Sequence, residues 1–154
     1  SHTHARMYVA SLPGGRATFR MQAAGRTSVS VDVCLPGMDD GDHGFHIHTH
    51  GDTTDGCTSM GGHYNPSGSA HGSRSATQRH AGDLGNVRSV GGCIHTSFDV
   101  HGLTDDIVGR GVVLHARADD LGRGNDAESL KNGGSGARIA CGVIARASSA
   151  YASS

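Results

Sequence analysis

Residues 27–37, TSVSVDVCLPG, alternate strictly between apolar and polar side chains. One face of this segment would carry Val29, Val31, Val33 and Leu35, and the other would carry Ser28, Ser30, Asp32 and Cys34. A period of two is typical of a β-strand with one face buried and the other in water. The Pro-Gly pair at 36–37 predicts the turn that ends the strand.

Similar segments occur along the rest of the chain, at 6–12, 16–23, 93–100, 110–116 and 138–145. Pro-Gly-Gly at 13–15 predicts a hairpin between the first two. Segment 93–100 alternates as cleanly as 27–35: Cys93, His95, Ser97 and Asp99 would share the face opposite Ile94, Thr96, Phe98 and Val100. Some eight short strands indicate an all-β sandwich or barrel.

The composition supports a β-rich fold and excludes some functions. The chain has 154 residues, 25 of them Gly, with only 35% hydrophobic and 4% aromatic residues and no Trp. Gly costs about 1 kcal/mol relative to Ala inside a helix, which disfavours helices. The net charge of −1 gives no reason to expect nucleic acid. No apolar run approaches the ~20 residues of a membrane span. We expect one domain over 1–154, with 1–5 and 147–154 as loose tails.

Two stretches interrupt the strand pattern, at 51–83 and 118–137. Loops longer than about 12–15 residues in a compact domain are either functional or disordered. The first stretch contains His63, His71, His80 and Asp83, a combination that completes a tetrahedral zinc set with no open position. Histidines spaced along a flexible surface loop are the alternative interpretation.

A second group of histidines lies on predicted strands. His46 and His48 share a strand face about 6.6–6.8 Å apart, while Phe45 and Ile47 would face the core. His115 lies among apolar residues, where a buried side chain facing inward is expected. An all-imidazole site would suit copper as well as zinc. A pair of surface histidines and a hydrogen-bonded core histidine are the alternatives.

Two four-coordinate ions need eight ligand positions, and these segments supply seven residues. A histidine serves two ions when both ring nitrogens are deprotonated. His63 lies where the strand-borne and loop-borne groups meet, so it is the candidate bridge.

The sequence resembles the copper/zinc superoxide dismutase family. The resemblance rests on HGFHIH, GDTTDGCTSMGGHYNP, HAGDLGNV, VVLHARADDLGRG and ARIACGVI, and it extends over most of residues 6–146. It implies an eight-stranded Greek-key β-sandwich or flattened barrel, immunoglobulin-like, with long zinc-binding and electrostatic loops. It implies copper on His46, His48, His63 and His115, and zinc on His63, His71, His80 and Asp83.

The resemblance also implies a reaction, the dismutation of two superoxide anions to dioxygen and hydrogen peroxide. His63 would deliver a proton, and Arg138 would guide the anion with its fork of donors. Asp119 would hydrogen-bond one copper ligand and one zinc ligand, which fixes their rings. Glu128 and Lys131 would lie in the electrostatic loop and affect rate and salt dependence. A copper-delivery domain without dismutase activity and a zinc-only structural domain are the alternatives on the same fold.

Four cysteines allow three pairings. The resemblance implies a Cys57–Cys141 disulfide. It also makes the strands of Cys34 and Cys93 antiparallel neighbours, so we hypothesise a second disulfide there, with two free thiols as the alternative. A second disulfide would favour a secreted protein over a cytoplasmic one.

Some positions depart from the family pattern. Segment 97–107 is shorter than usual, and His50 and Arg146 replace apolar residues of the usual subunit contact. A homodimer is therefore expected to be weakened. Superoxide and a copper chaperone are the expected partners.

Overall fold

A computed structural model describes residues 6–148 of the chain. Its strands are β1 (Met7–Leu12), β2 (Gly15–Met21), β3 (Arg26–Cys34), β4 (Gly41–His48), β5 (Thr54–Cys57), β6 (Asp83–Val90), β7 (Cys93–His101), β8 (Gly111–His115) and β9 (Arg138–Arg146). One α-helix, α1 (Ala127–Asn132), and three 3₁₀ turns, η1 (Ala23–Gly25), η2 (Thr58–Met60) and η3 (Asp105–Ile107), complete the elements of this range. No helix among these residues is long and apolar enough to cross a membrane.

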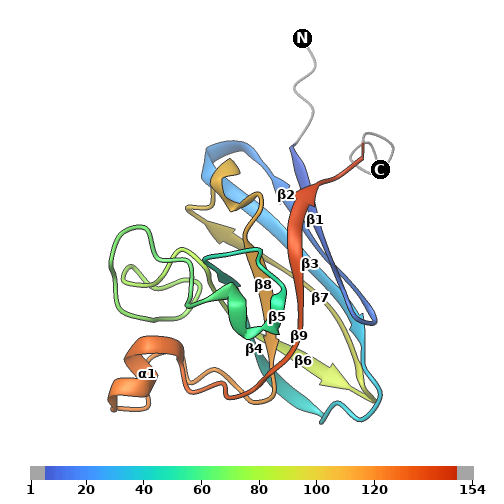
Figure 1. The fold of residues 1–154 in the computed structure, drawn as a ribbon. Coiled ribbons are helices and arrows are strands. Elements are labelled where there is room, and N and C mark those ends of the chain that lie inside the picture. Colours follow the sequence, from blue (N-terminus) through green and yellow to red (C-terminus); the bar gives the residue numbers. More distant parts are fainter. Residues whose placement is uncertain (1–5, 149–154) are drawn as a thin grey trace.

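Eight of the strands close into an antiparallel barrel in the order β1-β2-β3-β7-β6-β4-β8-β9. The chain crosses from β3 to β4 without pairing them, and β7 returns to pair with β3 (Figure 1). The predicted eight-stranded, all-β Greek-key fold is therefore confirmed. The two long connections, 49–82 and 116–137, project from the same side of the barrel. They contact each other where the His71 amide donates to the Leu130 carbonyl at 2.9 Å.

The barrel interior is filled by the alternate residues that the sequence predicts. Val29, Val31 and Val33 of β3 are fully or almost fully buried. On β7, Ile94 lies opposite Val33 and Val100 lies opposite Thr27, and both are buried as well. The polar partners on both strands point outward to solvent. Burying one such aliphatic side chain stabilises the fold by about 1.5–3 kcal/mol, so the alternation alone strongly fixes the register.

The long connections contain more structure than the sequence predicts. β5 and η2 lie in the first connection, and α1 lies in the second. α1 forms because the Asp126 side chain accepts a hydrogen bond from the Ser129 amide and because Gly133 adopts the left-handed conformation that ends a helix. Segment 97–107 forms the end of β7 and η3. Of the expected tails, 1–5 and 149–154 lie outside the described residues.

Both expected disulfides are present, and none of the four cysteines is free. Cys34 and Cys93 lie directly opposite each other on β3 and β7, with Cα atoms 4.0 Å apart. The alternative of two free thiols is therefore wrong. Cys57 and Cys141 join the first long connection to β9.

Candidate metal centre

Six histidines and one aspartate gather between the barrel and its two long connections. We call His46, His48, His63 and His115 the strand set, and His63, His71, His80 and Asp83 the loop set. In each set, one ligand atom per residue lies within 4.8 Å of the ligand atoms of the other three, and every member is buried. His63 belongs to both sets.

Strand alternation positions the first set. Phe45 and Ile47 of β4 enter the barrel core, so His46 and His48 face the opposite side, under the long connections. His115 is buried there as well, beside His46, with ring centroids 4.9 Å apart. The prediction that His115 is buried is confirmed, and the preceding Leu114 is the residue that enters the barrel core. His63 joins them through a backbone bridge to His48.

Each ring of the strand set uses one nitrogen for orientation and leaves the other unpaired. His48 Nδ1 lies 2.7 Å from the Gly61 carbonyl, and His115 Nδ1 lies 3.0 Å from the Gly136 carbonyl. A carbonyl only accepts, so these Nδ1 atoms carry the proton and Nε2 keeps its lone pair. Among the buried polar atoms without a hydrogen-bond partner are His46 Nδ1 and the Nε2 atoms of His48, His63 and His115. Four converging unpaired nitrogens form a donor set that suits a copper ion.

Burial keeps the strand set neutral. Burial, and then the neighbouring His63, lower the pKa of His46 to about 3 and that of His48 to about 2. Burial also lowers the pKa of His115 to about 4. The imidazoles are therefore neutral at neutral pH, each with one protonated nitrogen and one lone pair, which is the form that binds metal.

The loop set is organised around Asp83. Asp83 Oδ1 lies 3.0 Å from His63 Nδ1, 2.7 Å from His71 Nδ1 and 3.2 Å from His80 Nδ1. Its other oxygen, Oδ2, accepts the backbone amides of Gly72 and His80. Four tetrahedral ligands at about 2.0–2.1 Å from zinc lie about 3.3 Å from one another, so these atoms fit that ion.

Charge distinguishes the loop set from the strand set. Burial would raise the pKa of Asp83, but hydrogen bonds from the three histidines outweigh it and hold that pKa well below its usual range. Burial would likewise lower the pKa of His71, but hydrogen bonds to Asp119 and Asp83 raise it to about 9. The loop set therefore already contains a charged pair at neutral pH.

Asp119 links the two sets. Its Oδ2 lies 2.8 Å from His46 Nε2, and its Oδ1 lies 2.7 Å from His71 Nε2. The Asn86 side chain holds the main chain of Asp119 in place. Its Nδ2 donates a hydrogen bond to the Asp119 carbonyl, and its Oδ1 accepts one from the Asp119 amide. Gly133 lies against the Asp119 side chain, so close that an added Cβ would lie 1.9 Å from Asp119 Oδ1.

Sequence reasoning missed several supporting residues. His43 is buried, with its two ring nitrogens each 2.8 Å from a carbonyl, those of Asp39 and His115. Asn86 was missed as well, although it orients Asp119. Spacing gave no signal for either residue, because each acts through main-chain atoms. His50 is exposed and belongs to neither set.

A cavity of about 490 Å³ opens over the strand set, which contributes His48, His63 and His115 to its lining. The predicted residues Arg138, Glu128 and Lys131 also line it, together with Arg117, which sequence reasoning missed. Three cations and one carboxylate make this opening favourable for a small anion.

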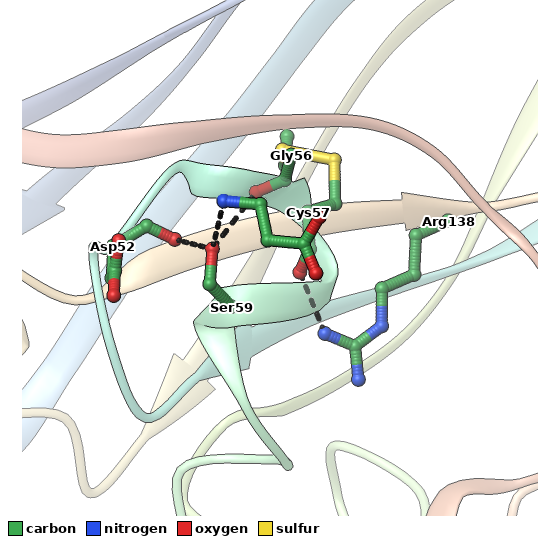
Figure 2. Close-up of a disulfide and its surroundings, with 7 residues drawn as sticks. Asp52, Gly56, Cys57, Ser59 and Arg138 are labelled. Carbon is green, nitrogen blue, oxygen red and sulfur yellow. Dashed lines mark hydrogen bonds between the residues drawn. A yellow bond between two sulfur atoms is a disulfide. The ribbon is translucent and has the colours of Figure 1, made fainter.

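Arg138 lies beside the Cys57–Cys141 disulfide and is hydrogen-bonded to the main chain of Cys57. Its guanidinium donates to the Cys57 carbonyl at 2.8 Å (Figure 2). Ser59 braces the same turn by donating to the Asp52 carbonyl and accepting the Asp55 amide. Cys141 lies three residues after Arg138 on β9. The disulfide therefore ties the strand that carries Arg138 to the turn that carries its acceptor, the Cys57 carbonyl.

Comparisons with known proteins identify the family. The sequence model of the copper/zinc superoxide dismutase family (SODC) matches residues 14–144. Superoxide dismutase [Cu-Zn] A of Xenopus laevis is 46% identical over 134 residues, which cover 84% of this chain and 87% of the relative. Superoxide dismutase [Cu-Zn] of Schizosaccharomyces pombe is 50% identical over 136 residues, covering 84% and 88%. The extracellular superoxide dismutase [Cu-Zn] of Drosophila melanogaster is 49% identical over 135 residues, covering 84% and 74%. The chain therefore belongs to the copper/zinc superoxide dismutase family.

Proposed function

We propose that this protein catalyses the dismutation of superoxide, in which two superoxide anions and two protons give dioxygen and hydrogen peroxide. The observation that supports this most strongly is the set of four unpaired imidazole nitrogens at the base of a cation-lined cavity. The strand set would hold copper, and the loop set would hold zinc. When bound, copper supplies the one-electron oxidation and reduction, while zinc has no redox chemistry and supplies positive charge.

The residues of the cavity would bind the anion and supply a proton. Arg138 offers paired donors to a small anion, and Arg117 and Lys131 add positive potential along the entrance. Glu128, at the same cavity, would affect the rate and its salt dependence. His63 presents Nε2 among the strand-set nitrogens and Nδ1 to the loop set, so Nε2 is the atom at which we place the transferred proton.

Metal content measured together with activity tests this proposal. We expect one copper and one zinc per chain in active protein, and no dismutation after copper is removed. Full copper occupancy without dismutation would favour the copper-delivery alternative. Zinc in both sets, with copper excluded, would favour a structural domain.

We propose that residues 1–154 form a single domain that associates only weakly with a second copy and receives copper from a chaperone. Val143 and Ile139 are 38% and 39% exposed, which supports an apolar contact, but His50 and Arg146 lie exposed as well and weaken it. Sedimentation of dilute, metal-loaded protein should show mostly monomer.

We further propose an oxidising, extracellular location, which the two disulfides support. A cytoplasmic location is the alternative.

A further inference from the structure

We propose that the outer face of β3 and β7 carries a third metal site, which forms only when the Cys34–Cys93 disulfide is reduced. Its ligands would be the two thiolates and His95, and it would take a divalent cation that accepts sulfur ligands, such as Zn²⁺. One ligand atom from each of the three residues lies within 4.8 Å of the other two. This proposal does not depend on the dismutation of superoxide.

The register of the two strands places these ligands together. Cys34 pairs with Cys93, and Asp32 pairs with His95 two positions along. Residues two apart on a strand share a face, so all four side chains project from the same outward patch. The Cys34 and Cys93 sulfurs are at present bonded to each other, which leaves neither free to bind a cation.

Asp32 orients the ring of His95. Its Nδ1 lies 2.9 Å from Asp32 Oδ1, and the two side chains are 66% and 56% exposed. Such an exposed pair contributes little to stability, so its main effect is on orientation. Because the carboxylate accepts a hydrogen bond from Nδ1–H, the proton stays on Nδ1 and Nε2 keeps the lone pair that a metal needs. A carboxylate behind a histidine is the usual arrangement around protein-bound zinc.

Reduction would allow the sulfurs to separate into ligand positions. Tetrahedral zinc with sulfurs at about 2.3 Å needs them about 3.8 Å apart. Cys34 ends β3 and Cys93 begins β7 after Gly91 and Gly92, so small shifts there leave the central ladder intact. Three protein ligands leave the fourth position to water, as in an open zinc site.

A phosphine can reduce the Cys34–Cys93 disulfide in a balanced reaction. The phosphine, one water molecule and the disulfide give the phosphine oxide and two thiols. Binding of the cation then releases the two thiol protons. Cys57 and Cys141 belong to no comparable group among the described residues, so their reduction would create no such site.

Cobalt spectroscopy on the copper- and zinc-loaded protein tests this site. The strand and loop sets contain no sulfur, so a thiolate-to-Co²⁺ charge-transfer band reports cysteine ligation alone. After anaerobic reduction with a phosphine, Co²⁺ should give this band at one ion per chain, and added Zn²⁺ should abolish it. The oxidised protein should give no band.

Matched variants locate the signal. Cys57→Ser with Cys141→Ser should keep the band, and Cys34→Ser with Cys93→Ser should lose it. Asp32→Asn should weaken Co²⁺ binding about 10- to 100-fold. His95→Ala removes a ligand and should weaken Co²⁺ binding more than Asp32→Asn does, while the disulfide still forms. Absence of the band in reduced protein, or its persistence without Cys34 and Cys93, would overturn the proposal.

Discussion

The strand set and the loop set share His63 but are prepared for metal in opposite ways. Regular β-structure holds most of the strand set, whose nitrogens are buried, neutral and unpaired. Irregular chain holds most of the loop set, whose donors already contact the ionised Asp83. The comparison teaches that a rigid scaffold tolerates unpaired buried donors, whereas a loop needs internal hydrogen bonds to keep its ligands in place.

The largest effect that would test this comparison is the pH dependence of the metal-free protein. The buried histidines of the strand set have pKa values of about 3, 2 and 4, below 6.5 for free histidine, so protonation favours unfolding. Their contribution is complete above pH 6.5 and is lost as the pH falls toward 4. The loss is about 1.4 kcal/mol per pH unit for each proton.

The loop set should respond in the opposite direction. The pKa of His71 is raised to about 9, so its contribution is complete below pH 6.5 and is lost as the pH rises through 9. Denaturant unfolding of metal-free protein should therefore give a stability maximum near pH 6.5. A free energy of unfolding that increases steadily from pH 5 to 9 would contradict the assigned difference between the sets.

Replacing Asp83 tests the loop set directly. Asp83→Asn removes the carboxylate that three histidines and two amides contact, and we expect a loss of about 3–5 kcal/mol in stability. Zinc should be lost, while copper should still bind to the strand set. Thermal unfolding and metal analysis check both expectations. Asp106→Asn, at an exposed carboxylate bonded to Tyr64 and Arg110, is the matched control. If copper is lost with zinc, the two sets are not separable.

Arg138 tests the cavity above the strand set. Arg138→Ala removes a charge-assisted donor worth about 1.5–3 kcal/mol, so the dismutation rate constant should fall about 10- to 100-fold. Copper and zinc content should not change, because Arg138 belongs to neither set. Arg138→Lys keeps the charge and should retain part of the rate. An unchanged rate in the alanine variant would remove Arg138 from the proposed anion path.

The fold was largely predictable because its strands alternate. Val29, Val31 and Val33 identify a buried face without any tertiary information, and Ile94 and Val100 do the same on β7. Helix α1 was not predictable, because its six residues are stabilised by the Asp126 cap and by the turn at Gly133. A composition rich in Gly disfavours helices on average, but it does not exclude one short helix whose ends are capped.

The metal ligands were also accessible from the sequence, since histidine and aspartate spacing singles them out. Their supporting contacts were not. His43 holds the His115 carbonyl, and Asn86 holds the Asp119 main chain. These positions depend on where carbonyl and amide groups lie after folding, which no residue pattern specifies. The same applies to Gly133, whose importance comes from a contact and not from a motif.

Gly133 offers the smallest but most specific test, because it lies where the two sets are linked. It has a φ of 77°, and an added Cβ would lie 1.9 Å from Asp119 Oδ1 and 2.6 Å from His71 Nε2. Gly133→Ala should reduce stability by about 1–3 kcal/mol and should weaken metal binding at both sets, because Asp119 contacts both His46 and His71. Unfolding and competitive metal titration measure these effects.

The neighbouring Gly134 provides the control for this last variant. Its φ of 63° makes an alanine there similarly strained, but the added Cβ would lie 3.6 Å from Asp120 Oδ2, which is an ordinary contact. Gly134→Ala should therefore lose stability through backbone strain alone and should keep its metal affinities. If both variants bind metal equally well, Asp119 adjusts freely and the two sets are less tightly coupled than their shared hydrogen bonds indicate.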